Sequence, residues 1–227
     1  MSNNSKIYGQ NGYAFENTAW QRKGIVGTNE EGAEAVYNRM APVTFEQRPF
    51  SVQLNNEAVE SGDFCVVRTS DTEIPIGVTR GRYDVVQPLE YCQMFDANVK
   101  QPVDTLFFLG TKADRMCLTW KLPKIDVYGD IVKCFGFLAT GFDGKFGEHL
   151  HLLNFRLACE NMFNSVIRNI QSLVYRGRHS NNNHARDLSL WLEFVQRDAQ
   201  EHVQIYQNLF CKMEETKVTV DDARAIF

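Results

Sequence analysis

Arginines gathered in one segment are the most chemically suggestive feature of this sequence. Residues 151–186 hold five arginines and a single acid, Glu160, although the formal net charge of the chain is −4. The segment includes a polar loop at 176–184, which reads Arg-Gly-Arg-His-Ser-Asn-Asn-Asn-His. Guanidinium groups match the geometry of phosphate, and asparagine can bond sugar, phosphate or base edges. The segment therefore predicts a nucleic-acid site, with two alternatives: a solvated loop, or arginines that pair with acids across the fold.

A second basic spot follows residue 78. Arg80 and Arg82 flank Gly81 and precede Tyr83, so arginine can contact phosphate while tyrosine stacks on a base. The alternative is a hairpin tip that carries ordinary solubilising charge. The residues predicted to bind nucleic acid are Arg80, Arg82, Arg156, Arg168, Arg176, Arg178 and His179.

Two histidines at 149 and 151 raise the question of a metal site. On a strand, residues two apart share one face, so His149 and His151 would lie together with Glu148 on the opposite face. A zinc ion needs further ligands at about 2 Å, and these would have to come from elsewhere in the fold. We favour the alternative, a polar edge strand with solvated imidazoles, and expect neither a metal nor a cofactor.

Catalytic motifs are missing from the sequence. It has no phosphate loop of the Walker type, no G-x-G-x-x-G after a strand and no G-x-S-x-G elbow. A nucleophilic thiol must be exposed and have a lowered pKa, whereas Cys159 falls on the apolar face of its expected helix and is better explained by core packing. We therefore expect no catalytic residue. The acidic candidates for an unrecognised hydrolase or nuclease are Asp126, Asp130, Asp143 and Glu148.

The termini and cysteines bear on the compartment. Residues 1–10 are polar, without the apolar core of a signal peptide, and no uninterrupted apolar stretch reaches the length of a membrane span. The six cysteines form no C-x-x-C pair. We expect a soluble cytoplasmic protein with free thiols.

Hydrophobic patterning predicts the elements that must position these residues. Residues 1–42 read as a polar N-terminal arm with a short helix at 30–40, and residues 43–227 as a single domain. Strands are expected at 50–54, 64–69, 75–78, 83–86, 105–109, 115–122, 130–140 and 146–153, with Asp143-Gly144 as a turn. Helices are expected at 88–99, 155–175 and 184–215. The order predicts an α+β fold: a curved antiparallel sheet backed by helices, with two long C-terminal helices.

Four segments together resemble a phage/plasmid-like protein family of unknown function. They are 77–88, 117–122 with Gly129-Asp130 after it, 138–144, and the R-x-x-C-x-N motif of Arg156, Cys159 and Asn161 with Arg178-His179-Ser180 after it. The likeness spans about residues 45–215 and depends on the order and spacing of the segments. Two departures stand out: Leu-Ala-Cys-Glu at 157–160, where the family often has Val-Val-Cys followed by Gln or Asn, and Ser180 in place of threonine.

The element order of this family is similar to the core of single-strand annealing recombinases. That resemblance implies a cationic groove lined by Arg156, Arg168, Arg176, Arg178 and His179. It also implies a homo-oligomer that binds single-stranded DNA and anneals it without a nucleophile. The alternative is a non-enzymatic factor that binds a host or phage protein, motivated by the acidic region at 26–73.

Overall fold

The main sheet of the protein has six antiparallel strands. The computed structural model describes residues 25–26, 30–70, 73–80, 83, 85–109, 112–127, 130–153, 160–168, 172–178 and 184–215. In spatial order the strands are β1 (Ile25–Val26), β5 (Val103–Leu109), β6 (Arg115–Lys121), β9 (Phe135–Gly141), β10 (Glu148–Leu153) and β11 (Leu173–Gly177). Helices pack on this sheet, so the predicted α+β class, an antiparallel sheet backed by helices, is confirmed.

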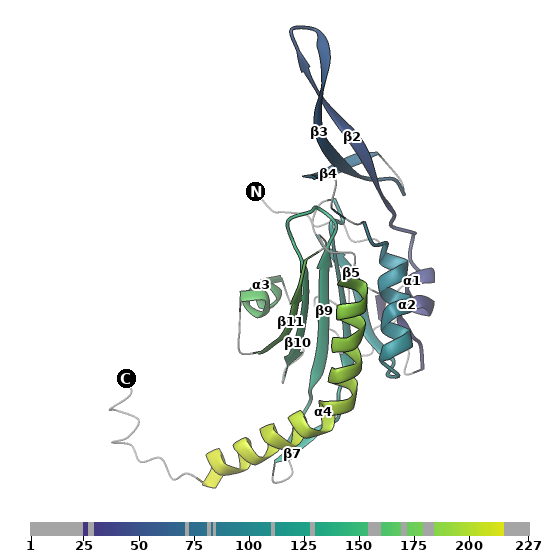
Figure 1. Ribbon diagram of the computed structural model, residues 1–227. Coiled ribbons are helices and arrows are strands. Elements are labelled where there is room, and N and C mark those ends of the chain that lie inside the picture. Colours follow the sequence, from purple (N-terminus) through teal and green to yellow (C-terminus); the bar gives the residue numbers. More distant parts are fainter. Residues whose placement is uncertain are drawn as a thin grey trace, which may run out of the picture.

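Both faces of the main sheet are buried, which explains why its central strands read as continuous apolar runs. On one face Leu106, Leu118, Leu138 and Leu150 form a row across four strands, and all four are buried. Three helices cover this face: α1 (Ala33–Asn38), α2 (Pro88–Asn98) and the first half of α4 (His184–Glu215). On the other face α3 (Glu160–Arg168) packs Phe163 against Phe137. Figure 1 shows α3 apart from the other helices.

A second, three-stranded sheet projects from the body. It comprises β2 (Phe45–Leu54), β3 (Glu57–Arg68) and β4 (Ile74–Thr79). The chain reverses at Asn55 and Asn56, which both have the positive φ that a two-residue hairpin turn requires. Residues 51–62 are exposed throughout and extend well beyond the body in Figure 1. We call them the hairpin arm.

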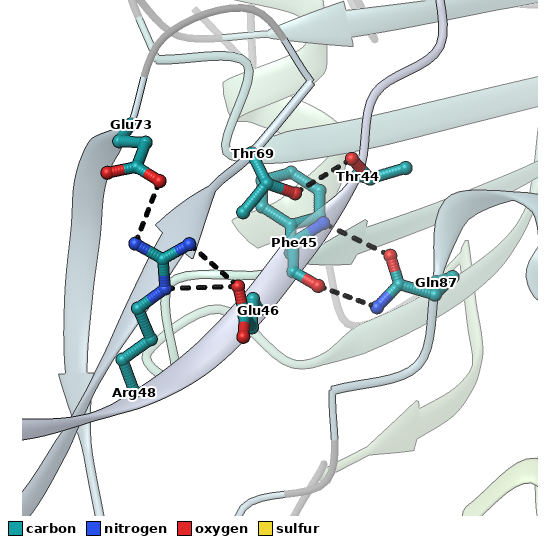
Figure 2. Close-up of polar contacts among 7 residues, drawn as sticks. All are labelled: Thr44, Phe45, Glu46, Arg48, Thr69, Glu73 and Gln87. Atoms are coloured by element: carbon teal, nitrogen blue, oxygen red, sulfur yellow. Dashed lines mark hydrogen bonds and ion pairs between the residues drawn. The ribbon is translucent and has the colours of Figure 1, made fainter.

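Side-chain hydrogen bonds fasten the small sheet to the body at the base of β2 (Figure 2). The amide of Gln87 donates to the carbonyl of Phe45 at 2.9 Å and accepts from its N–H at 3.1 Å. Gln87 is also the N-cap of α2, in a capping box with Glu90. On the outer side, Arg48 bridges the carboxylates of Glu46 and Glu73. A single amide thus joins β2 to the start of α2.

The structure corrects part of the predicted helical content. Only 160–168 of the expected helix at 155–175 is described as helix, and 173–177 form the edge strand β11. Leu173, Val174 and Tyr175 fit either pattern, and pairing with the open side of β10 decides for a strand. The first of the two long C-terminal helices therefore ends before residue 173. The second, α4, spans the predicted residues.

Two strand predictions also change. The expected strand at 130–140 is divided into β8 (Asp130–Val132), which pairs with β7 (Ile125–Val127), and β9. Residues 83 and 85–86 are not in a strand. The boundary predicted at residue 42, between an N-terminal arm and the main domain, stays a prediction. Ala33 and Val36 of α1 precede this boundary and are buried in the main core.

Candidate nucleic-acid interface

A cavity of about 340 Å³ opens where the edge of the main sheet meets the base of the small sheet. We call it the edge pocket. Its lining comes from the end of β11, from the turn between β9 and β10, and from the segment after β4. The lining residues are Tyr83, Gly144, Lys145, Phe146, Gly147, Arg176, Gly177 and Arg178.

The turn between β9 and β10 is built around a carboxylate. Asp143 accepts hydrogen bonds from the backbone N–H groups of Lys145 and Phe146, each at 2.9 Å. A short acidic side chain that bonds its own backbone two or three residues on is the usual reason for aspartate in a turn. This arrangement holds the backbone of Lys145 at the pocket while its side chain stays exposed.

Two glycines let the walls of the pocket approach. A β-carbon on Gly147 would overlap the carbonyl oxygen of Gly177, so the beginning of β10 and the end of β11 touch through their backbones. On the other side, Gly77 of β4 lies against the carbonyl of Asp143. The turn is thus held between β4 and β11.

This packing brings Tyr83 of the second basic spot to the arginines of the first. Tyr83 lines the same pocket as Arg176 and Arg178, which follow almost a hundred residues later. The N–H of Tyr83 donates to the carbonyl of Arg80 at 3.0 Å, and Arg80 is exposed.

The cations of the pocket are turned to solvent. Lys145, Arg176 and Arg178 are all exposed. Ion pairs that the structure describes join Arg39 to Glu31, Arg48 to Glu46 and Glu73, and Lys121 to Asp104. Among the described residues, no ion pair includes Lys145, Arg176 or Arg178. The alternative of arginines buried against acids thus does not describe Arg176 or Arg178.

Aromatic rings support the cationic wall. Arg115 of β6 places its guanidinium 5.0 Å from the centre of the Phe146 ring, within range of a cation–π contact. On another side Phe146 stacks on His149 with ring centres 4.9 Å apart. The Phe146 ring is therefore held between charged and aromatic neighbours. Sequence reasoning missed both Lys145 and Arg115, although the Asp-Gly-Lys turn was a local signal for Lys145.

A buried carboxylate lies directly behind the pocket. Glu148 is fully buried and accepts hydrogen bonds from Tyr91 at 2.5 Å and from Tyr175 at 3.4 Å. A β-carbon on Gly177 would overlap the Glu148 carboxylate. Only the backbone of Gly177 therefore separates this carboxylate from the pocket. Burial and the nearby carboxylate raise the pKa of Tyr91 well above its usual value and also raise that of Tyr175. Both hydroxyls therefore remain donors.

The histidines of β10 lie on the opposite face from Glu148, as their spacing predicts. They are not solvated, however: His149 is 4% exposed and His151 is fully buried. The expectation of an exposed edge strand was wrong because β11 covers that side of β10 and α3 packs over the face. Burial lowers the pKa of each to about 4, assisted by Arg176 for His149 and by His149 for His151.

Because their pKa values are lowered to about 4, both imidazoles are neutral at pH 7. Their rings are parallel with centres 6.0 Å apart, and Nδ1 of His151 lies 3.0 Å from the hydroxyl of Ser172. In the described part of the chain, no three histidine, cysteine or acidic side chains come together in a way that could hold a metal ion.

The seven predicted binding residues divide into three groups. Arg176 and Arg178 line the edge pocket, and the carbonyl of Arg80 accepts a hydrogen bond from the N–H of the lining residue Tyr83. Arg168 is exposed at the end of α3 and does not line the pocket. Outside the described residues lie Arg82, Arg156 and His179, together with Cys159.

The four acids considered for a hydrolase are dispersed in the structure. Asp143 forms the turn, and Glu148 is enclosed by tyrosines. Asp126 and Asp130 belong to the separate β7–β8 hairpin. The five described cysteines are free thiols: Cys65, Cys92, Cys117, Cys134 and Cys211.

Comparisons with known proteins do not add to this geometry. No family model, curated protein or solved structure matches the chain. Within the described ranges, none of the helices has the length and apolar character needed to cross a membrane.

Proposed function

We propose that the protein binds single-stranded DNA at the edge pocket and anneals complementary strands during recombination of a phage or plasmid. The observation that carries this proposal is the convergence of Lys145, Arg176 and Arg178 on one pocket that also contains Tyr83. These cations come from the turn between β9 and β10 and from the end of β11, and all three are exposed in a chain of net negative charge.

The chemistry of the pocket suits a single strand. Cationic side chains hold the phosphate backbone, and aromatic faces accept bases without requiring a particular sequence. Tyr83 is half-buried, packs against the main core and lines the pocket, and in this proposal it supplies one such face. Annealing needs a bound backbone and free base edges, and it needs neither a nucleophile nor a nucleotide cofactor. Because annealing brings two strands together, the proposal includes a homo-oligomer as the active form.

Binding of labelled single-stranded DNA across a salt series tests this proposal. Contacts to phosphate release counterions, so the logarithm of the affinity falls by roughly 0.7 per contact for each tenfold rise in salt. We expect binding at low salt that weakens steadily as salt increases. Failure to bind at low salt, or an affinity that does not change with salt, would exclude a backbone-binding role. Light scattering with and without DNA tests the homo-oligomer.

A second candidate function is binding of a host or phage protein, and the hairpin arm favours it. Val52, Leu54 and Val59 of the arm are exposed apolar residues. No lysine or arginine occurs between residues 49 and 67, whereas Glu57, Glu60 and Asp63 do. Exposed apolar residues on a projecting strand pair are typical of interaction surfaces. A pull-down that recovers a stoichiometric protein partner after nuclease treatment would favour this function over the first.

A further inference from the structure

We infer that the edge pocket is a site for a terminal phosphate: it takes a phosphate monoester on a nucleotide, at the end of a strand. This inference rests on the proposed binding of single-stranded DNA and names the part of the strand that the pocket recognises. Four properties of the pocket lead to it: its charge, its volume, its backbone wall and its closed rear side.

The charge of the pocket exceeds that of one internal phosphate. An internal phosphodiester carries a single negative charge, whereas a phosphate monoester carries about −1.5 to −2 at pH 7. Lys145, Arg176 and Arg178 bring three positive charges to one cavity. Arg115 adds a fourth nearby through its contact with Phe146. A dianionic group at a strand end uses this charge more fully than a single linkage within a strand.

The volume of the pocket corresponds to one small group. Ligand pockets have volumes of roughly 300–1,000 Å³, and this one, at about 340 Å³, lies near the lower limit. It accommodates a phosphate with an adjoining sugar or base against Tyr83, and it is too small for several stacked nucleotides. A long strand would therefore place one nucleotide in the pocket and the rest outside it.

The walls of the pocket suit a compact tetrahedral anion. Gly144, Gly147 and Gly177 contribute only backbone to the lining of the pocket. A phosphate can thus come close to the main chain while the longer cationic side chains reach it from the rim. Backbone approach of this kind is common in phosphate sites.

The pocket is closed behind Gly177. Glu148 and Tyr175 lie against the far side of this glycine, and Tyr91 donates to the same carboxylate. A bound strand must therefore enter and leave by the open side of the pocket, and a nucleotide at a strand end needs one such passage where an internal nucleotide needs two.

Strands with different ends test the inference. Fluorescence anisotropy would compare short single strands of one sequence that carry a 5′-phosphate, a 3′-phosphate or hydroxyls at both ends, together with a circular strand that has no ends. A nucleoside monophosphate and its nucleoside, used as competitors, distinguish a strand end from a free nucleotide. We expect one phosphorylated strand to bind about tenfold more tightly than the hydroxyl-ended strand, and the monophosphate alone to compete.

The variant Lys145→Gln assigns the preference to this pocket. Because Lys145 is exposed, the substitution should leave the melting temperature nearly unchanged. It should abolish the preference for the phosphorylated end, and it should lower the affinity for hydroxyl-ended and circular strands equally, by the one backbone contact that is lost. The matched control Lys124→Gln, at an exposed lysine outside the pocket lining, should retain the preference.

The possible results separate the inference from the proposed function. Equal affinities for phosphorylated, hydroxyl-ended and circular strands would overturn the terminal-phosphate site and leave DNA binding intact. A preference that survives in Lys145→Gln would also overturn it, because the end would then bind elsewhere. If no strand binds but the monophosphate binds better than the nucleoside, the pocket takes phosphate and the DNA-binding proposal fails. Absence of all binding would overturn both.

Discussion

Gly147 and Gly177 touch through their backbones, so that a β-carbon on Gly147 would overlap the carbonyl oxygen of Gly177. This contact fixes the beginning of β10 against the end of β11. It therefore sets where Arg176 and Arg178 lie relative to the turn that carries Lys145. The cationic pocket depends on the absence of a side chain at this position.

Replacing Gly147 by alanine should destabilise the protein, because the colliding atom belongs to the backbone and cannot rotate away. Overpacking of this kind costs roughly 1–3 kcal/mol, measured as a change in the free energy of unfolding by urea. The control is Gly62→Ala on the hairpin arm, where a β-carbon meets open space and only the positive φ is unfavourable. Gly147→Ala should also weaken DNA binding, because it displaces the walls of the pocket, whereas Gly62→Ala should leave DNA affinity unchanged. Equal effects of the two substitutions on DNA affinity would contradict the account.

The two tyrosines that bond Glu148 form a matched pair for a second prediction. Tyr91 donates at 2.5 Å and Tyr175 at 3.4 Å, near the limit of a hydrogen bond. Removing a donor from a buried carboxylate costs about 1–3 kcal/mol. We expect Tyr91→Phe to show a loss of that size and Tyr175→Phe a clearly smaller one, both by urea unfolding. A larger loss for Tyr175→Phe would mean that Glu148 depends on the other hydroxyl.

The buried histidines predict a pH dependence of stability. Burial lowers the pKa of His149 and His151 from 6.5 to about 4 in the folded protein. Between these values the unfolded chain binds more protons, so the free energy of unfolding falls as the pH falls from 6.5 towards 4. Each histidine contributes up to about 1.4 kcal/mol per pH unit in that window. The double variant His149→Leu/His151→Leu should show a shallower fall in urea unfolding between these pH values. An unchanged slope would assign the titration to other groups.

Gln87 joins the small sheet to the body through both atoms of its amide. In Gln87→Glu the shape is kept, but the donor to the carbonyl of Phe45 is lost and a negative charge faces that oxygen. A loss of roughly 1–3 kcal/mol in the free energy of unfolding is expected. Gln53→Glu, on the exposed hairpin arm, is the matched control and should change stability little. A loss of similar size in Gln53→Glu would contradict this role for Gln87.

Local patterns in the sequence predicted the elements and the type of site, but not how they combine. The largely apolar runs of β5 and β6, the Asp143-Gly144 turn and the helix beginning at Pro88 were all recognisable because short-range propensities determine them. The edge strand β11 was not, since its five residues fit helix or strand and only pairing with β10 decides. The two basic spots were predicted separately, and the fold brings Tyr83 beside Arg176 and Arg178.

The errors at the histidines and acids have the same origin. His149 and His151 were expected to be solvated because the sequence does not reveal what covers an edge strand. Glu148 was one candidate acid among four, and its tyrosine partners come from 57 and 27 residues away. Contacts at such separations depend on the whole topology, so composition and spacing do not predict them.

The most direct test of the central claim reverses the charge of the pocket. Arg176→Glu/Arg178→Glu is compared with Lys100→Glu/Lys124→Glu, which changes the net charge equally at exposed lysines outside the pocket lining. Binding of single-stranded DNA is measured over a salt series. We predict that the arginine variant binds about tenfold more weakly or worse. The slope of log affinity against log salt should become shallower by roughly 1.4, because two phosphate contacts of about 0.7 each are lost. The lysine variant should remain close to the unaltered protein. Equal losses in the two variants would contradict the account, because binding would then follow net charge and not the edge pocket.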